Sequence, residues 1–307
     1  MKKLVYLFSL CLFVNVLYAQ NNCFDFKEST TLVTKSISNT KTLDFQMDFF
    51  INKLNKDDIY IPFRLPLIDE LFLDVTLKSF SVVTDNHTLI IETDLGQKKE
   101  EFHTSLLSYY IFYKEEIIGT LLFFDNNIIV TYKHANRQFE INKVNNEIVL
   151  FDVNDCINQN TFSCAVEEKA REISINNHLS ESITIPDCIE LAIEVDQYTR
   201  NTFSSNTTAT NWAHAIIAGV SQVFFGEVNV HLNVVHTIIW TTADPYASII
   251  NDAGAMLSAL RNQWTANNGS ISRDLVHLLT KRSNTGTGGI AYVDVLCNNS
   301  WGYAFSS

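Results

Sequence analysis

Eight histidines are the residues of this chain best suited to metal chemistry, and their spacing decides what they can do. They are His87, His103, His134, His178, His214, His231, His236 and His277. Hydrolysis by a metal-activated water needs three protein ligands around a zinc ion and a glutamate as general base. No histidine stands in an H-E-x-x-H sequence, and core or surface roles are expected for all eight. His231 and His236 are five residues apart on an expected strand, which places them on opposite faces.

Other reactive groups give no stronger signal. Glu190, Glu194 and Asp196 alternate along an expected strand, where they could bind calcium or form a solvated face, and we expect the solvated face. No serine or cysteine nucleophile has His and Asp at a recognisable spacing. The segment 286–289 is rich in glycine but lacks the preceding strand and following helix that a dinucleotide-binding loop needs.

One segment near the end of the sequence is suited to binding rather than catalysis. Gly289, Ile290, Ala291, Tyr292 and Val293 form a short apolar strand that follows a loop of Gly, Ser, Asn and Thr. Such a loop permits an antiparallel strand at the edge of a sheet. The unpaired N–H and C=O groups of an edge strand can hold an extended peptide as an added strand. An ordinary edge strand without a ligand is the alternative.

The start of the sequence predicts export. Residues 1–19 combine Lys2 and Lys3 with an apolar run and a plausible cleavage site after Ala19, which is typical of a secretory signal peptide. We therefore expect a secreted, extracellular or periplasmic protein without a membrane span after cleavage. The formal net charge of -12 argues against nucleic acid or an anionic membrane as a partner.

Five cysteines remain after removal of the signal peptide, and an odd number in an oxidising compartment implies a free thiol, an intermolecular bridge or a missing partner. Cys164 lies near the expected junction of two domains. It could form a disulfide with Cys23, Cys156 or Cys188.

Two domains and a connector must position these residues. Residues 20–152 contain short apolar or alternating runs separated by turn signals, which predict a β-rich domain, either a small antiparallel sandwich or a barrel. Residues 153–186 form a polar connector. Residues 187–307 predict strands and helices in the order β-α-β-α-β-β, so the fold class is α+β with an α/β half-domain at the end.

Particular elements of the second half can be placed from their patterns. A helical stripe of apolar residues leads from Trp212 to Phe224 and is expected to end at Gly226. Residues 228–240 form a long β-branched strand. Asp244-Pro245 predicts the start of a second helix, because an Asp cap and a Pro at the first helical position suit the unpaired amides there. Residues 275–279 and 290–296 predict two last strands.

This arrangement resembles the upper half of the catalytic domain of metzincin zinc peptidases, in the bacterial reprolysin-like (M12, M12B) branch. The resemblance rests on Asp274-Leu275-Val276-His277-Leu278-Leu279, on the segment 288–297 and on the order of elements over about 110 residues. Residues 20–152 resemble the propeptide of the same family more weakly, around 61–67. A connector of this kind is where a propeptide would be cut.

The resemblance implies a secreted zinc metalloendopeptidase precursor that hydrolyses protein or peptide substrates. It assigns substrate binding to Gly289–Val293. It also implies that Cys164 keeps the precursor latent as a thiolate bound to the zinc, and a disulfide remains the alternative for this cysteine. The zinc ligands of H-E-x-x-H-x-x-G-x-x-H are expected downstream of Ser307, so the sequence is expected to be an inactive fragment with no catalytic or metal residue of its own. The absent helix is expected to leave one sheet face as an apolar patch.

Two alternatives from other classes remain. The first is a secreted non-catalytic protein that keeps the α/β half-domain to bind peptides. The second is an adhesin built on the β-rich domain. A continuation of the gene that encodes the zinc motif would favour the peptidase, and a stop codon after Ser307 would exclude it.

Overall fold

The computed structural model describes residues 22–27, 39–54, 59–144, 146–156, 165–167, 187–296 and 298–307. The predicted signal peptide lies outside these residues. The chain divides into two compact units: residues 1–80 with 108–159, and residues 81–107 with 160–307. No helix among the described residues is long and apolar enough to span a membrane.

The first unit is built on a nine-stranded sheet with the strand order β1-β2-β11-β10-β9-β8-β7-β4-β3. Its strand pairs with a described register are antiparallel. The strands are β1 Phe24–Lys27, β2 Thr40–Phe45, β3 Ile61–Pro66, β4 Phe72–Phe80, β7 Leu107–Tyr113, β8 Glu116–Phe124, β9 Asn127–His134, β10 Arg137–Val144 and β11 Glu147–Asp152. A helix, α2 (Met47–Leu54), and a 3-10 turn, η1 (Val153–Asp155), complete this unit.

Tight turns set the register of this meander. The β8–β9 turn has positive φ angles at Asp125 (48°) and Asn126 (61°), and the β9–β10 turn at Ala135 (49°) and Asn136 (62°). Two consecutive left-handed residues match the twist of flanking strands, and Asn and Asp adopt this conformation more readily than most residues. Turns were expected between the short strands of this half, and Asp125-Asn126 forms one of them.

The second unit contains an eight-stranded sheet with the order β12-β16-β17-β15-β13-β14-β5-β6. The strands are β5 Val83–Thr93, β6 Gly96–Glu100, β12 Ala165–Glu167, β13 Asp187–Val195, β14 Val230–Trp240, β15 Leu275–Leu279, β16 Gly289–Tyr292 and β17 Tyr303–Ser306. The helices are α3 Gln197–Arg200, α4 Asn206–Val228 and α5 Ala253–Asn267. Four successive pairs, from β17 through β15, β13 and β14 to β5, are parallel.

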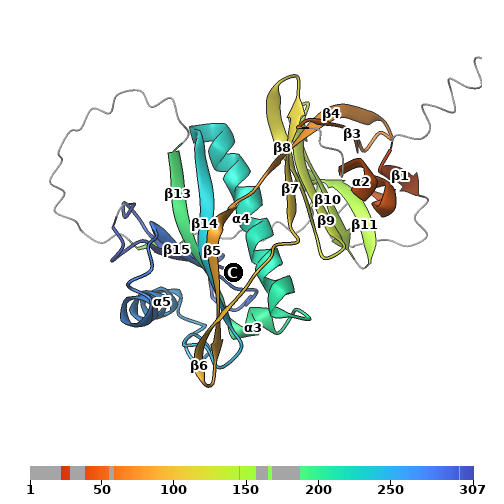
Figure 1. Cartoon of the computed structure of the whole chain (residues 1–307). Coiled ribbons are helices and arrows are strands. Elements are labelled where there is room, and N and C mark those ends of the chain that lie inside the picture. The colour runs from red at the N-terminus through yellow and green to blue at the C-terminus, as the bar shows by residue number, and fades with distance from the viewer. Residues whose placement is uncertain are drawn as a thin grey trace, which may run out of the picture. The chain divides into compact units, whose positions relative to one another are not determined.

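The helices α4 and α5 lie along different parts of this sheet (Figure 1). The helix α4 packs mainly on β14 and also contacts β13. The helix α5 contributes Met256, Leu260 and Trp264 to a buried cluster with alternate residues of the strands, among them Ala192 and Val276. Because side chains alternate across a strand, the residues between them, such as Leu191 and Leu275, belong to the opposite face.

The predicted α+β class is confirmed, but the chain is divided differently from the expected domains. We predicted one uninterrupted β-rich domain over residues 20–152. The structure instead places the β5–β6 hairpin in the second sheet, with β5 parallel to β14 in the register Ile90↔Ile238. Leu89 and Ile91 are 2% exposed there. The position of the β5–β6 hairpin in the sequence favoured pairing with the neighbouring strands of the first unit. The burial of its apolar side chains beside β14 places it in the second sheet instead.

The predicted helix start at Asp244-Pro245 is wrong. The helix α5 begins at Ala253, where the side chain of Asp252 accepts a hydrogen bond from the amide of Ala255 at 2.9 Å. Asp244 caps no long helix and is buried, because it takes part in a polar network described below. The helix α4 also runs past Gly226 to Val228 and ends at Asn229, whose φ of 56° is left-handed.

Candidate functional site

The predicted binding strand is present as β16, but it is shorter than expected. It spans Gly289–Tyr292, and Val293 lies beyond it with 44% of its surface exposed. Ile290 and Tyr292 face the buried cluster under α5, whereas Gly289 and Ala291 are half-buried on the other face. A Cβ at Gly289 would lie 2.7 Å from the carbonyl oxygen of Phe305, so only glycine fits at the start of this strand.

Among the described residues, β16 is not an edge strand, which corrects the prediction. On one side it pairs antiparallel with β17, in the register Ile290↔Phe305. On the other side it pairs in parallel with β12, in the register Val166↔Ala291. The edge is occupied because a segment of the predicted connector supplies an additional strand.

The strand β17 was not predicted, and it changes how β16 joins the sheet. It lies between β15 and β16 and pairs in parallel with β15, in the register Leu278↔Phe305. The alternation in Tyr303-Ala304-Phe305-Ser306 was the available signal, since Tyr303 and Phe305 are buried and the other two are half-buried. Four residues are too few for periodicity to separate a strand from a loop.

Cys164 lies outside the described residues and directly precedes β12 in the sequence. Its predicted latency role and its predicted disulfide therefore both stay predictions. Cys23, Cys156 and Cys188 are free thiols. Burial raises the pKa of the Cys23 thiol to about 11, which keeps it protonated and unreactive at neutral pH.

The described histidines do not assemble a zinc site. The closest association joins His87 and His214, whose Nε2 atoms each lie 2.9 Å from the hydroxyl oxygen of Thr237. Burial lowers the pKa of His214 to about 3 and that of His87 to about 4, so both rings are neutral. No group of three or more His, Cys, Asp or Glu side chains suited to a metal ion occurs in the described part of the chain. His178 is not among the described residues.

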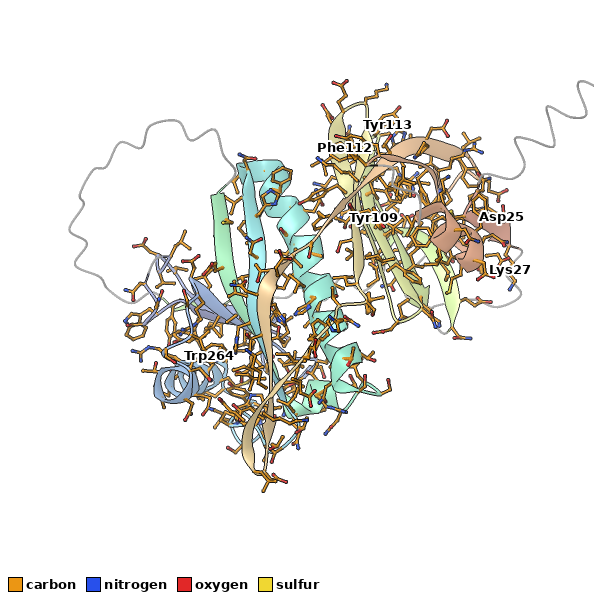
Figure 2. The ribbon with its side chains drawn as sticks, in the orientation of Figure 1. Asp25, Lys27, Tyr109, Phe112, Tyr113 and Trp264 are labelled. Atoms are coloured by element: carbon orange, nitrogen blue, oxygen red, sulfur yellow. The ribbon has the colours of Figure 1, made fainter. Side chains whose placement is uncertain are left out.

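We expected Glu190, Glu194 and Asp196 to form a solvated face. This prediction is wrong for Glu194 and Asp196, which are buried. Glu194 is fully buried and accepts hydrogen bonds from Trp240 Nε1 at 2.6 Å, from the Tyr246 hydroxyl and from Trp264 Nε1. Trp264 lies on α5 (Figure 2). Burial raises the pKa of Glu194 to about 7, although these three hydrogen bonds lower it. The carboxyl group therefore ties α5 to β13 and β14.

Asp196 belongs to a second buried network at the carboxyl ends of the parallel strands. Its Oδ2 atom accepts hydrogen bonds from Thr280 Oγ1 at 2.8 Å and from Arg282 Nε at 2.7 Å. Arg282 also donates from Nη2 to Asp244 at 3.3 Å. Asp196 caps α3 through the amide of Thr199. This network fixes the beginning of the loop that leads from β15 to β16.

The sheet face that carries Leu191 and Leu275 is covered by α4 only in part. Beside α4 the face opens into a groove of about 510 Å³, lined by Trp212, Ile216 and Phe224 of the helix. The apolar stripe that predicted α4 therefore lines this groove. The helix instead buries its small residues, among them Ala209, Ala213 and Ala218. A neighbouring hollow of about 360 Å³ continues over Ala291 and Ala304.

The strands β13 to β17, the helices α3 to α5 and the groove lie in the segment that comparison with known proteins matches. The family model Reprolysin_5, Metallo-peptidase family M12, matches residues 186–307. Residues 186–307 are therefore similar to the metallopeptidases of family M12. The predicted resemblance is confirmed for this part of the chain, and metallopeptidases of this family act on proteins or peptides.

Two further comparisons are less informative. No curated protein sequence matches the chain. Among solved structures, the chain is similar to the crystal structure of metalloproteinase-II from Bacteroides fragilis. The identity is 12% and the TM-score 0.46, over 85% of this chain and 78% of that chain.

Proposed function

We propose that the chain is part of a secreted zinc metalloendopeptidase precursor, with a signal peptide over 1–19, a propeptide-like first unit and an M12 segment that holds the substrate. The observation that carries this proposal is the family match over residues 186–307, which includes every strand from β13 to β17. Export is proposed from the signal-like sequence of residues 1–19. Peptide-bond hydrolysis is proposed from the family match.

The strand β16 is proposed to hold the substrate backbone. A strand with one side free offers its N–H and C=O groups to an extended peptide. The side chains of Ile290 and Tyr292 anchor β16 in the core, which leaves the backbone fixed in place. The half-buried Ala291 is small and lines the neighbouring hollow, so a substrate side chain has room beside it.

The pairing of β12 with β16 supports latency. Ala165–Glu167 occupies the side of β16 that a substrate would need, and it runs parallel to β16. We propose that release or cleavage of the connector frees this side of the strand. Cys164 is adjacent to β12 in the sequence, so its proposed part in latency depends on β12 lying beside β16.

Zinc is implied by the family, but the described residues do not fit it, since they bring no ligand set together and the sequence has no H-E-x-x-H. No catalytic step through zinc is therefore derived for residues 1–307. The proposed activity requires ligands beyond them, and the apolar groove beside α4 is the surface on which a further helix would pack. Without such ligands, residues 1–307 are proposed to be inactive.

A non-catalytic peptide-binding protein is the second candidate, and the observation in its favour is that the residues described by the structure bring no metal-ligand set together. Both candidates use β16, and they differ in whether hydrolysis appears when a zinc helix is supplied. Extending the chain with the segment that follows codon 307 in the gene, and assaying casein hydrolysis with and without a chelator, separates them. Chelator-sensitive hydrolysis supports the peptidase, and its absence supports the binding protein.

The substrate strand itself can be tested in the 307-residue chain by the binding of fluorescein-labelled casein peptides. Prolines at Val166 and Glu167 should release β12, because proline cannot take its place in a strand ladder, and peptide binding should rise at least tenfold. The control carries the same two prolines at Asn176 and Asn177, in the connector outside β12. Equal binding by the two variants would contradict the assignment of β16.

A further inference from the structure

Two histidines attach the β5–β6 hairpin to the second sheet, and the proposed peptidase function does not use them. His87 of β5 and His214 of α4 each place Nε2 at 2.9 Å from the hydroxyl oxygen of Thr237 on β14. Their ring centroids are 5.1 Å apart, and the ring of Phe102 lies at 5.7 Å from the first and 5.4 Å from the second. One hydroxyl group therefore joins three elements that are far apart in the chain.

A bulge in β5 allows His87 to reach this position. The register of β5 on β14 shifts between Val83 and Thr88, where residues 84–87 stand against the single residue 235. Extra residues of this kind bend a strand and redirect a side chain. The bulge therefore lets the hairpin contact the helix that packs on β14 as well as the strand itself.

The cluster stabilises neutral rings and has no acceptor for further protons. His214 is 0% exposed, and its Nδ1 atom is buried without a hydrogen-bond partner among the described residues. In the neutral state one ring can donate to the oxygen of Thr237 while the hydroxyl group donates to the other ring. If both rings are protonated, both must donate to the same oxygen. A buried cation without a partner is costly.

The charged and titratable groups on the surrounding elements do not compensate a protonated ring. They are the ion pairs Lys98–Glu100 and His103–Glu101 on and after β6, the exposed Asp85, Glu92 bonded to Gln97, Arg200 bonded to Asn206, His231 at the start of β14, Glu227 at the end of α4 and His236 on the opposite face of β14. Within the described part of the chain, the polar partner of both rings is Thr237. Burial also lowers the pKa of His236 to about 4, so this third histidine acts in the same direction.

We propose that these histidines make the attachment of residues 81–107 to the sheet of the second unit sensitive to acid. The hairpin stays on β14 at neutral pH and is released when the rings take up protons. The inference rests on the proposed function in one respect: the hairpin is continuous in sequence with the propeptide-like first unit, so its release would loosen that unit from the matched segment. The attachment itself needs neither zinc nor hydrolysis.

The direction of the pH effect follows from the attached state. Burial lowers the pKa of His87 to about 4 and that of His214 to about 3, whereas a released ring returns toward 6.5. The released state therefore binds more protons below pH 6.5. Attachment is complete above pH 6.5 and weakens as the pH falls, by roughly twentyfold for each histidine between pH 7.0 and 5.0.

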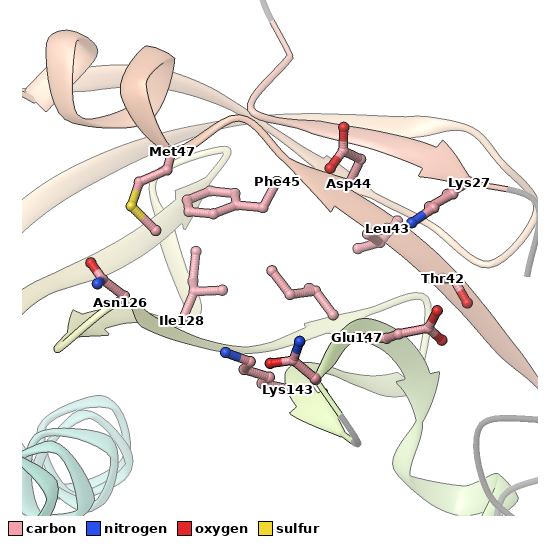
Figure 3. Close-up of a pocket in the computed structure, with 12 residues that line it drawn as sticks. Lys27, Thr42, Leu43, Asp44, Phe45, Met47, Asn126, Ile128, Lys143 and Glu147 are labelled. Carbon is pink, nitrogen blue, oxygen red and sulfur yellow. The ribbon is translucent and has the colours of Figure 1, made fainter. Parts of the chain in front are cut away.

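Hydrogen exchange of the full chain, followed by mass spectrometry, measures this attachment locally. Dividing each rate by that of an unfolded amide at the same pH gives a protection factor. Protection of β5 should fall at least a hundredfold between pH 7.0 and 5.0. Residues 40–45 of β2 are the internal reference, because the side chains around them in Figure 3 include no histidine. Their protection should change less than threefold.

Two variants assign the effect to the cluster. His87→Gln keeps an N–H donor near the position of Nε2 but does not titrate, so the loss of β5 protection should be roughly twentyfold smaller than in the wild type. His103→Gln is the matched control, since His103 is exposed and follows the same hairpin, and it should keep the full loss. If His87→Gln fails to fold, His214→Gln takes its place with the same expectation.

Equal losses in the wild type and the His87 or His214 variant would overturn the proposal, and so would unchanged β5 protection in the wild type. The measurement involves no peptide cleavage. A chain that never hydrolyses casein can therefore still show acid-sensitive attachment, and an active peptidase can lack it.

Discussion

Glu194 and Asp196 are two residues apart on one chain segment, yet they stabilise the second unit by different means. Glu194 is surrounded by the neutral donors Trp240, Tyr246 and Trp264. Asp196 faces the cation Arg282. A buried carboxylate held only by neutral donors loses more hydration than it regains in charge interaction, which is why burial dominates the pKa of Glu194.

The stability of the protein should therefore depend on Glu194 between pH 4.5 and 7. Burial raises its pKa from 4.5 to about 7, so in this window the folded state keeps a proton that the unfolded chain has released. The stabilisation is complete below pH 4.5 and is lost as the pH rises through 7, by roughly 3 kcal/mol. The buried neutral His87 and His214 act in the opposite direction, since their lowered pKa values favour folding as the pH rises toward 6.5.

Comparison of Glu194→Gln with the wild type isolates this contribution. Urea unfolding at pH 5.0 and 7.5 should show that the variant loses the Glu194-dependent decrease, a difference of about 2 to 3 kcal/mol between the two pH values. Its stability at pH 5.0 should also be lower, because a glutamine amide faces the Trp264 donor. The control is Glu190→Gln, a half-buried carboxyl on the same strand. Parallel pH profiles for Glu194→Gln and the wild type would refute the assignment.

At the scale of the element, two aspartates show that one sequence signal can serve two purposes. Asp252 caps α5, whereas Asp244, the predicted cap, is bonded to the amides of Gln197 and Tyr246 and to Arg282. Capping patterns identify an aspartate with free acceptor atoms. They do not reveal whether those acceptors meet the next helix or a distant loop.

Substitution of the two aspartates by alanine should separate these purposes. Asp252→Ala removes one exposed cap and should cost about 1 kcal/mol of unfolding free energy. Asp244→Ala breaks a buried ion pair and leaves two amides without their acceptor, so a cost of about 3 to 5 kcal/mol is expected. Thermal and urea unfolding give both values under the same conditions. The network would be of little importance if Asp244→Ala cost no more than Asp252→Ala.

At the scale of the whole molecule, neither unit is a continuous stretch of chain. Residues 81–107 leave the first unit, form the β5–β6 hairpin on β14 in the second, and the chain then returns to β7. The M12 match begins only at residue 186, so the sheet of the matched segment depends on a hairpin outside it.

A fragment of residues 160–307 should therefore not fold by itself. Without β5 it loses the pairing along β14 from Val234 to Trp240 and exposes an apolar strand edge. Gel filtration and circular dichroism should show an aggregated or loosely ordered fragment, and a peptide of residues 81–107 should restore cooperative unfolding. A fragment that melts cooperatively without the peptide would show that the hairpin is dispensable.

The sequence by itself determined the elements whose signals are local. Two-residue turns, the long strand β14 and the helix α4 follow from turn residues, β-branched runs and apolar periodicity. The family resemblance followed from the order of elements, and it is confirmed over residues 186–307. The segment Gly289–Val293, proposed to hold the substrate, was expected to be a strand, and Gly289–Tyr292 forms one, because alternation is a property of neighbouring residues.

Only the tertiary structure decided which strand lies beside which. The insertion of β17 next to β16, the pairing of β12 with β16 and the transfer of β5–β6 to β14 each join residues far apart in the chain. The burial of Glu194 and Asp196 depends on donors more than 40 residues away. Hydrophobic and turn patterns report the local backbone conformation and the face of a strand. These patterns do not tell which distant strand will pair with a given strand, or which distant donor will bond a buried carboxylate. Packing of the complete chain decides both.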